Sequence, residues 1–141
     1  MDAKATKLSS GFDDPKHSPS KIFLFEDEPI LLKLMEEELV HRNLDVWSFS
    51  CPDEFEATCQ ISDLKGQVLI TDEHMPGTNG ADFINKIGKE LGEERPLTII
   101  FTGDEESLIN NKGLDYTDLV VEKPIDPEEL IGTLEELVRN R

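Results

Sequence analysis

Residues 21–29 read KIFLFEDEP, a short apolar run that leads directly into three acidic residues and a proline. Four consecutive apolar residues, Ile22 to Phe25, are typical of a strand that is buried on both faces of a sheet. Apolar residues then return at helical spacing, at Ile30, Leu31, Leu34, Met35 and Leu39. The stretch therefore predicts a β-strand and an amphipathic α-helix, with carboxylates at the turn between them.

The same alternation of apolar runs and helical stripes continues along the chain. Further strands are predicted at residues 46–49, 68–71, 97–101 and 119–121. Five β-α units in a row imply a parallel sheet with helices on both faces, because each parallel connection needs a crossover. Right-handed crossovers leave few topologies. We therefore expect an α/β fold of the flavodoxin-like (βα)5 type, a doubly wound parallel sheet with strand order 2-1-3-4-5.

Helix starts are predicted from capping residues. Ser50 is the expected N-cap of a second helix that runs to about residue 61. Asn79 is expected to cap a third helix, and a shorter, more polar helix is expected at residues 105–111. Asp126 is expected to cap the last helix, because a proline follows it in the first turn.

The length of 141 residues suits one domain, and the 37% of hydrophobic residues is enough for a single core. The first twenty residues show no apolar period and are predicted to form a flexible tail, so the domain is expected over residues 21–141. No run of about 18 apolar residues and no secretory signal occurs. Cys51 and Cys59 lack a metal-type spacing, and a reduced, cytoplasmic setting is the simplest expectation.

Acidic residues outnumber basic ones by a wide margin. Asp and Glu number 31 against 14 Lys and Arg, which gives a formal net charge of −17. This excess argues against contact with DNA or RNA, which needs a basic footprint, and against docking on anionic membranes. The composition instead favours a protein that binds cations or contacts basic or mixed protein surfaces.

Polar side chains follow four of the five predicted strands at the point where each strand ends. Glu26 and Asp27 follow the first strand, Asp72 the third, Thr102 the fourth and Lys123 the fifth. Because parallel strands end at one edge of a sheet, we expect these side chains to converge there. Clustered carboxylates need a counter-charge, and Mg²⁺ accepts one or two carboxylates while it keeps water and phosphate in its other positions.

Such a site is suited to phosphoryl transfer. With the metal bound, Asp72 can act as a nucleophile toward phosphorus, since carboxylates form covalent aspartyl phosphates. Mg²⁺ and Lys123 would offset the charge of the phosphoryl oxygens, and Thr102 could donate a hydrogen bond to one of them. Taken singly, each residue also has an ordinary role, as a strand-end acid, a helix cap or a surface lysine. Their convergence is what favours the chemical interpretation.

Four short motifs occur in order at these strand ends: FEDEP at residues 25–29, TDEHMPGTNG at 71–80, FTGD at 101–104 and VVEKP at 120–124. Together they resemble the receiver domain of two-component response regulators, in the superfamily of the chemotaxis regulators. The resemblance implies a phosphorelay protein that accepts a phosphoryl group from a sensor histidine kinase or a histidine phosphotransfer protein. Phosphorylation would then switch its binding to a downstream protein target. The resemblance also implies that the chain is not an enzyme but assists its own phosphorylation and dephosphorylation.

The resemblance also implies a role for each residue. Asp72 is the expected phosphoacceptor, and Thr102 and Lys123 take the hydroxyl and ammonium roles. The metal is expected on Glu26, Asp27, Asp72 and the backbone carbonyl of His74. In this set Asp27 binds the ion directly, and Glu26 supports it through water.

Two features depart from the family pattern. Receivers often carry an aromatic residue three positions before the lysine, and here that position is Val120, so the usual rotating aromatic switch is not expected. Tyr116 is nearby but out of register. Residues 110–118 lack the usual Gly-Ala step, and this surface, which many receivers use for output, is expected to be unusual.

Alternatives to the phosphorylation switch remain. A degenerate receiver could hold a metal or contact a protein without being phosphorylated. A haloacid-dehalogenase-like phosphohydrolase would need a second aspartate two residues after the nucleophile, where this chain has His74. The chain could also be the receiver fragment of a larger regulator or hybrid kinase. Within the switch hypothesis, His74 and Asp104 are candidates for tuning the lifetime of the phosphate.

Overall fold

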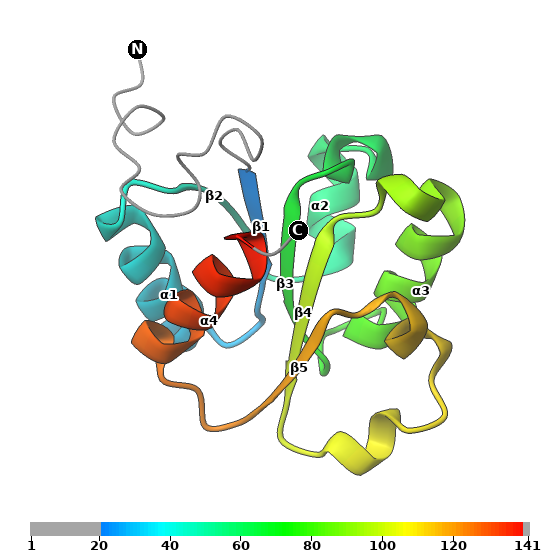
Figure 1. The fold of residues 1–141 in the computed structure, drawn as a ribbon. Coiled ribbons are helices and arrows are strands. Elements are labelled where there is room, and N and C mark those ends of the chain that lie inside the picture. Colours follow the sequence, from blue (N-terminus) through cyan, green and yellow to red (C-terminus); the bar gives the residue numbers. More distant parts are fainter. Residues whose placement is uncertain (1–20, 140–141) are drawn as a thin grey trace.

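The computed structural model describes residues 21–139 and places five parallel strands in one sheet. The strands are β1 (Lys21–Phe25), β2 (Asp45–Phe49), β3 (Val68–Asp72), β4 (Leu97–Thr102) and β5 (Leu119–Glu122). Their order is β2-β1-β3-β4-β5, which confirms the expected doubly wound topology (Figure 1). The predicted tail, residues 1–20, lies outside the described residues.

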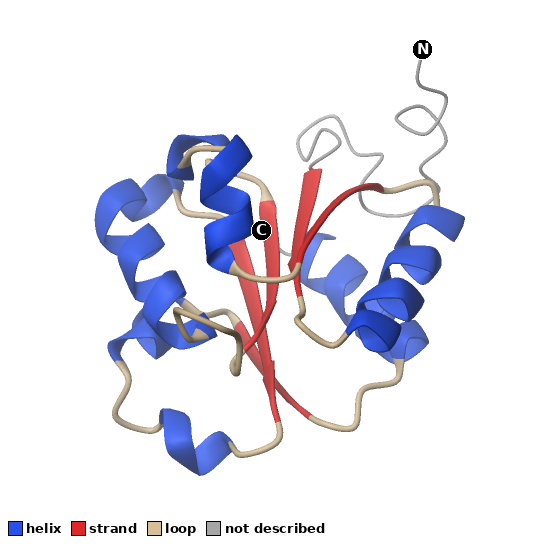
Figure 2. Cartoon of the chain, turned by 180° about the vertical axis from the view of Figure 1, so that it is seen from behind, coloured by secondary structure: helices blue, strands red, loops and turns tan. Residues whose placement is uncertain are grey.

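Helices cover both faces of the sheet (Figure 2). Residues 21–139 contain α1 (Pro29–His41), α2 (Pro52–Thr58), α3 (Gly80–Leu91), which the 3₁₀ helix η5 (Gly92–Glu94) extends, and α4 (Pro127–Arg139). α1 and α4 lie side by side on one face, and α2 and α3 cover the other. A chain that winds first one way along the sheet and then the other places its helices in this way. Over the same residues, no helix is long and apolar enough to cross a membrane.

The two faces of the sheet bury different cores. The core under α1 and α4 is mainly aliphatic and includes Met35 and Leu39 of α1 and Leu134 of α4. The core under α2 and α3 is rich in phenylalanine, with Phe23, Phe25, Phe49, Phe55 and Phe83. The central strands supply side chains to both cores because successive residues point to opposite faces. Because the central strands are buried on both faces, their apolar runs are continuous. Polar residues begin only where these strands end and leave the core.

The second helix is shorter than expected and begins at a different residue. Pro52 occupies its first position, where a fixed φ and a missing N–H suit a helix start. Cys51 is therefore the N-cap, and the expectation of Ser50 was wrong. The helix ends before Cys59, and a 3₁₀ helix, η4 (Ile61–Leu64), follows. The two cysteines flank this helix and do not share it.

The connection between β4 and β5 differs most from the expectation. In place of the helix expected at residues 105–111, it holds two 3₁₀ helices, η6 (Glu105–Leu108) and η7 (Lys112–Tyr116). The Asn111 side chain accepts a hydrogen bond from the Gly113 N–H at 2.8 Å, and this turn starts a new helix instead of continuing the first. The described chain thus keeps the five strands of the (βα)5 pattern with four α-helices.

One glycine of α3 gives a stability prediction. Gly88 lies directly beneath the ring of Tyr116, and a Cβ atom on it would overlap that ring. We expect Gly88→Ala to lower the free energy of unfolding by about 1–3 kcal/mol, because the ring would have to move. Gly132 of α4 is the matched control, since nothing lies within 4 Å of a Cβ placed there. Gly132→Ala should raise that free energy by up to about 1 kcal/mol.

Urea denaturation followed by circular dichroism measures both variants. If Gly88→Ala were as stable as the parent protein, Tyr116 would not pack on α3 as described.

Candidate functional site

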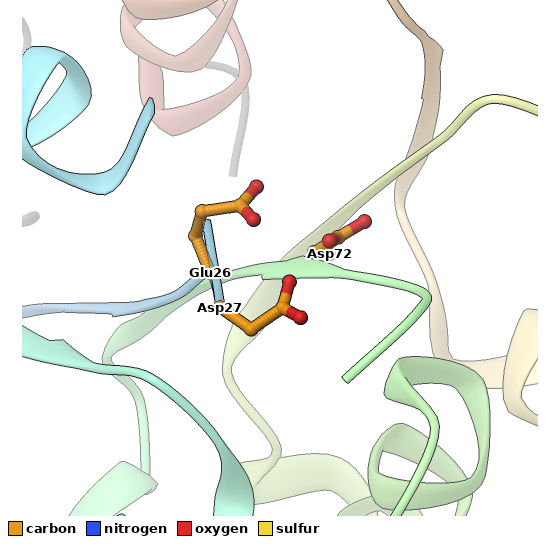
Figure 3. Close-up of side chains that lie close together, drawn as sticks. All are labelled: Glu26, Asp27 and Asp72. Atoms are coloured by element: carbon orange, nitrogen blue, oxygen red, sulfur yellow. The ribbon is translucent and has the colours of Figure 1, made fainter. Parts of the chain in front are cut away.

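The predicted acids meet where β1 and β3 end side by side. Phe25, the last residue of β1, is paired with Thr71 of β3, so Glu26 and Asp27 emerge next to Asp72. Carboxylate oxygens of these three residues lie within 4.8 Å of one another and could hold a metal ion. Figure 3 shows the three side chains gathered at the ends of their strands. The sheet edge therefore brings together the three carboxylates that the sequence placed there.

Burial differs sharply among the three acids. Glu26 is 1% exposed and Asp72 is 2% exposed, whereas Asp27 is exposed to solvent. The Lys123 ammonium lies 3.3 Å from Asp72 Oδ1 and 3.8 Å from Glu26 Oε1. Neither of these two oxygens accepts a hydrogen bond from the residues that the structure describes. The pocket holds three carboxylates, and the Lys123 ammonium pairs with two of them, so the pocket carries excess negative charge.

The pKa of Glu26 is raised to about 7. Burial is the largest cause, because it penalises the charged carboxylate. The nearby Asp72 charge and a hydrogen bond with Asp27 raise the pKa further. A hydrogen bond from the Glu28 backbone N–H to Glu26 Oε2, at 2.8 Å, and the Lys123 charge act in the opposite direction. Near neutral pH this carboxyl group is therefore poised between its two protonation states.

Thr102 and Lys123 are joined by a backbone hydrogen bond at the edge of the sheet. Thr102 ends β4 and is fully buried, and its carbonyl accepts a hydrogen bond from the Lys123 N–H at 2.8 Å. The Thr102 hydroxyl oxygen accepts a hydrogen bond from the Asp104 N–H at 3.1 Å. Asp72 pairs with Phe101, the residue before Thr102. The Lys123–Pro124 peptide bond is cis. The Thr102 hydroxyl and the Lys123 ammonium thus lie at the same edge of the sheet as the acids.

His74 lies in the loop that follows β3, and its side chain is exposed. Only its backbone carbonyl was expected to bind a metal. The side chain is outside the group of clustered ligand atoms found among residues 21–139.

Glu73 is a feature of the site that sequence reasoning missed. Its side chain is 4% exposed, and Oε1 accepts a hydrogen bond from the Ala81 N–H at 2.8 Å. Burial raises the pKa of this carboxyl, while the Ala81 bond opposes the rise. Asn79 does occupy the N-cap position of α3, but its side chain makes no cap bond. The cap comes from a residue eight positions upstream of Ala81, which no local capping pattern reveals.

Val120 and Tyr116 have packing roles in this structure. Val120 is paired with Ile100 of β4 and packs against the phenylalanine-rich core. The Tyr116 ring covers Gly88, and the guanidinium of Arg95 lies over it, 5.5 Å from the ring centre. Tyr116 is therefore held against α3.

Several known proteins are similar to this chain in sequence. Residues 22–135 match the family model of the response regulator receiver domain. The chain is 30% identical over 125 residues to the response regulator ArlR of Staphylococcus aureus, covering 86% of this chain and 54% of ArlR. It is 27% identical over 118 residues to the hybrid signal transduction histidine kinase C of Dictyostelium discoideum, covering 79% of this chain. The chain spans about half the length of ArlR and 10% of the hybrid kinase.

Solved structures share the fold. The CheY-like response regulator receiver domain protein from Methanospirillum hungatei JF-1 has a TM-score of 0.70 at 19% identity, over 87% of this chain and 96% of that chain. The BeF3-activated DrrB receiver domain has a TM-score of 0.67 at 25% identity, over 86% and 98% of the two chains. The family match covers nearly all of the described residues and agrees with the strand order and the acidic pocket. The chain belongs to the response regulator receiver domain family.

Proposed function

We propose that this chain is a phosphorylation switch in which Asp72 accepts a phosphoryl group from a sensor histidine kinase or a histidine phosphotransfer protein. The observation that carries the proposal is the environment of Asp72. Its buried carboxylate lies beside Glu26 and Asp27, it faces the Lys123 ammonium at 3.3 Å, and its Oδ1 accepts no hydrogen bond from the described residues. An acid held in this way is available both to a cation and to phosphorus.

The residues present suit a magnesium ion. Two buried oxygens, Glu26 Oε1 and Asp72 Oδ1, pair with Lys123 but accept no hydrogen bond from the described residues, and oxygen is the ligand atom that Mg²⁺ prefers. We infer that Asp27, Asp72 and the His74 carbonyl would hold the ion directly, with Glu26 reached through water. When bound, the ion would neutralise the negative charge that builds up on the phosphoryl oxygens.

The chain's own groups would carry out the rest of the transfer. A carboxylate oxygen of Asp72 forms a bond to phosphorus while the phosphorus–nitrogen bond of the donor histidine breaks, and the imidazole leaves with the electron pair of that bond. The Lys123 ammonium remains paired with the acceptor and offsets the charge that the phosphoryl group adds. The Thr102 hydroxyl donates a hydrogen bond to a phosphoryl oxygen. Phosphorylation then changes the affinity for a downstream protein.

The relatives support this proposal over its rivals. ArlR is a response regulator, the Dictyostelium relative is a hybrid histidine kinase, and the DrrB receiver domain has been solved in a BeF3-activated form. Since the chain spans only part of its curated relatives, a receiver segment of a larger regulator or hybrid kinase would use the same chemistry. A module that is never phosphorylated would differ only in failing to form the adduct. We propose that the chain is not an enzyme for an external substrate.

Intact mass spectrometry tests the proposed function. The full chain is incubated with Mg²⁺ and acetyl phosphate, and we expect one added phosphoryl group. Omission of Mg²⁺ in the presence of EDTA, or the substitution Asp72→Asn, should abolish the adduct. Metal binding without an adduct would instead support the unphosphorylated module, and repeated turnover of a phosphate ester would support a phosphohydrolase.

The raised pKa of Glu26 gives a pH prediction. Its carboxyl has a pKa of about 7, so a bound proton competes with the ion below that pH. We expect the Kd for Mg²⁺ to fall as the pH rises from about 6 to about 8, because the carboxylate forms over this window. Isothermal titration calorimetry measures the Kd. Glu26→Gln, which cannot titrate, should flatten the curve, and a parent Kd that stays constant over the window would contradict the prediction.

A further inference from the structure

Glu73 caps helix α3 from outside the helix. It follows the proposed acceptor directly and is buried, and its Oε1 accepts the Ala81 N–H at 2.8 Å. Ala81 is the second residue of α3, and the first N–H groups of a helix have no partner within it. Asn79 is at the usual capping position but makes no side-chain bond there. The Glu73 carboxylate therefore caps the N-terminus of α3.

Backbone contacts join the same two segments. The Gly80 N–H donates to the Glu73 carbonyl at 2.8 Å, and a side chain on Gly80 would overlap the Asp72 carbonyl. The Glu73 N–H donates to the Phe101 carbonyl of β4 at 3.1 Å. The end of β3, the start of α3 and the end of β4 thus meet around one residue. This residue is next in sequence to the proposed acceptor.

The hydrogen bonds from Gly80 and Ala81 to Glu73 join the two ends of the loop of residues 74–79. This loop carries His74, and its far side rests on α2, where Asp53 lies 3.3 Å from the position of a Cβ on Gly77. Gly77 has a φ of 85°, which allows the loop to turn there. The loop that carries His74 is thus bonded to the start of α3 through Glu73.

We propose that Glu73 is a positioning residue for the phosphorylation site. Its bond to Ala81 holds the loop that presents the His74 carbonyl, and so it sets the Mg²⁺ affinity and the rate at which Asp72 is phosphorylated. The inference rests on the proposed function, in which that carbonyl is a metal ligand. Groups that orient a metal ligand typically change metal affinity by about 10–100-fold when they are removed.

Two neutral variants of similar length isolate the hydrogen bond. Glu73→Gln and Glu73→Met both remove the charge, but only glutamine keeps an oxygen that can accept the Ala81 N–H. By calorimetry, we expect Glu73→Met to bind Mg²⁺ about tenfold more weakly than Glu73→Gln, and to be phosphorylated by acetyl phosphate correspondingly more slowly. The Ala81 amide should also exchange with deuterium faster in Glu73→Met, as measured by NMR. Asn79→Ala should match the parent protein.

The comparison remains decisive if Glu73→Met does not fold. Glu73→Asp keeps the charge but is one carbon shorter, so it should bind Mg²⁺ more weakly than Glu73→Gln, and the reverse order would overturn the inference. Equal Mg²⁺ affinity and equal Ala81 exchange in the Gln and Met variants would overturn it as well. A parent protein that binds no Mg²⁺ overturns the proposed function and this inference together. A parent that binds Mg²⁺ and takes up phosphate, with indistinguishable Gln and Met variants, overturns this inference alone.

Discussion

Lys123→Gln should slow the phosphorylation of this protein by acetyl phosphate about 100-fold or more. The Lys123 ammonium lies 3.3 Å from Asp72 Oδ1 and 3.8 Å from Glu26 Oε1. Glutamine removes the positive charge that would face the phosphoryl oxygens as they approach the acceptor. The rate is read from the growth of the phosphorylated species by intact mass spectrometry at a fixed Mg²⁺ concentration.

Lys86→Gln is the matched control for this experiment. It removes one positive charge as well, but Lys86 pairs with Glu56 at 2.8 Å on an exposed surface of α2 and α3. We expect its phosphorylation rate to match that of the parent protein. If both variants slowed equally, the effect would come from net charge, and the role given to Lys123 would be wrong.

Phe25→Ala should have the largest effect on stability among the substitutions considered. Phe25 is fully buried, and its ring centre lies 5.1 Å from Phe83, 5.2 Å from Phe49 and 5.7 Å from Phe55. Truncation leaves a cavity in the phenylalanine-rich core, and we expect the free energy of unfolding to fall by about 3–5 kcal/mol. Because β1 ends at this residue, the loss also loosens the strand end that carries the adjacent acids.

Urea denaturation of Phe25→Ala measures this change. Phe25→Leu, which keeps most of the volume, should lose less, and Ile109→Ala, at a side chain that is 67% exposed, should change the free energy by no more than about 0.5 kcal/mol. A loss at Phe25 no larger than that at Ile109 would show that the aromatic cluster does not stabilise the fold.

The sequence predicted the sheet well because its strands are buried on both faces. A continuous apolar run such as Ile22 to Phe25 is a strong signal, and the rules for parallel connections then leave one favoured strand order. The positions of the acids, Thr102 and Lys123 follow from the same rules, since each comes at the end of a strand. The geometry of the acidic pocket is therefore largely encoded in where the apolar runs stop.

The connections between strands were predicted less well. The conformation of a short polar segment depends on local hydrogen bonds, and alternative sets of such bonds differ little in energy. The Asn111 bond to Gly113 separates two 3₁₀ helices where one α-helix was expected, and Pro52 moves the start of α2. The capping of α3 by Glu73 could not be predicted from the sequence for another reason. It bridges eight residues, and it depends on a buried carboxylate whose burial only the packed loop creates. A residue of this kind looks like an ordinary surface acid in the sequence.

Chemical trapping tests most directly whether Asp72 itself carries the phosphoryl group. The protein is phosphorylated with acetyl phosphate and Mg²⁺ and then treated with borohydride, whose hydride reduces an aspartyl phosphate to homoserine with release of phosphate. Peptide mass spectrometry then locates the altered residue. We expect homoserine at position 72 and nowhere else. Conversion at Asp27, or at no residue, would contradict it.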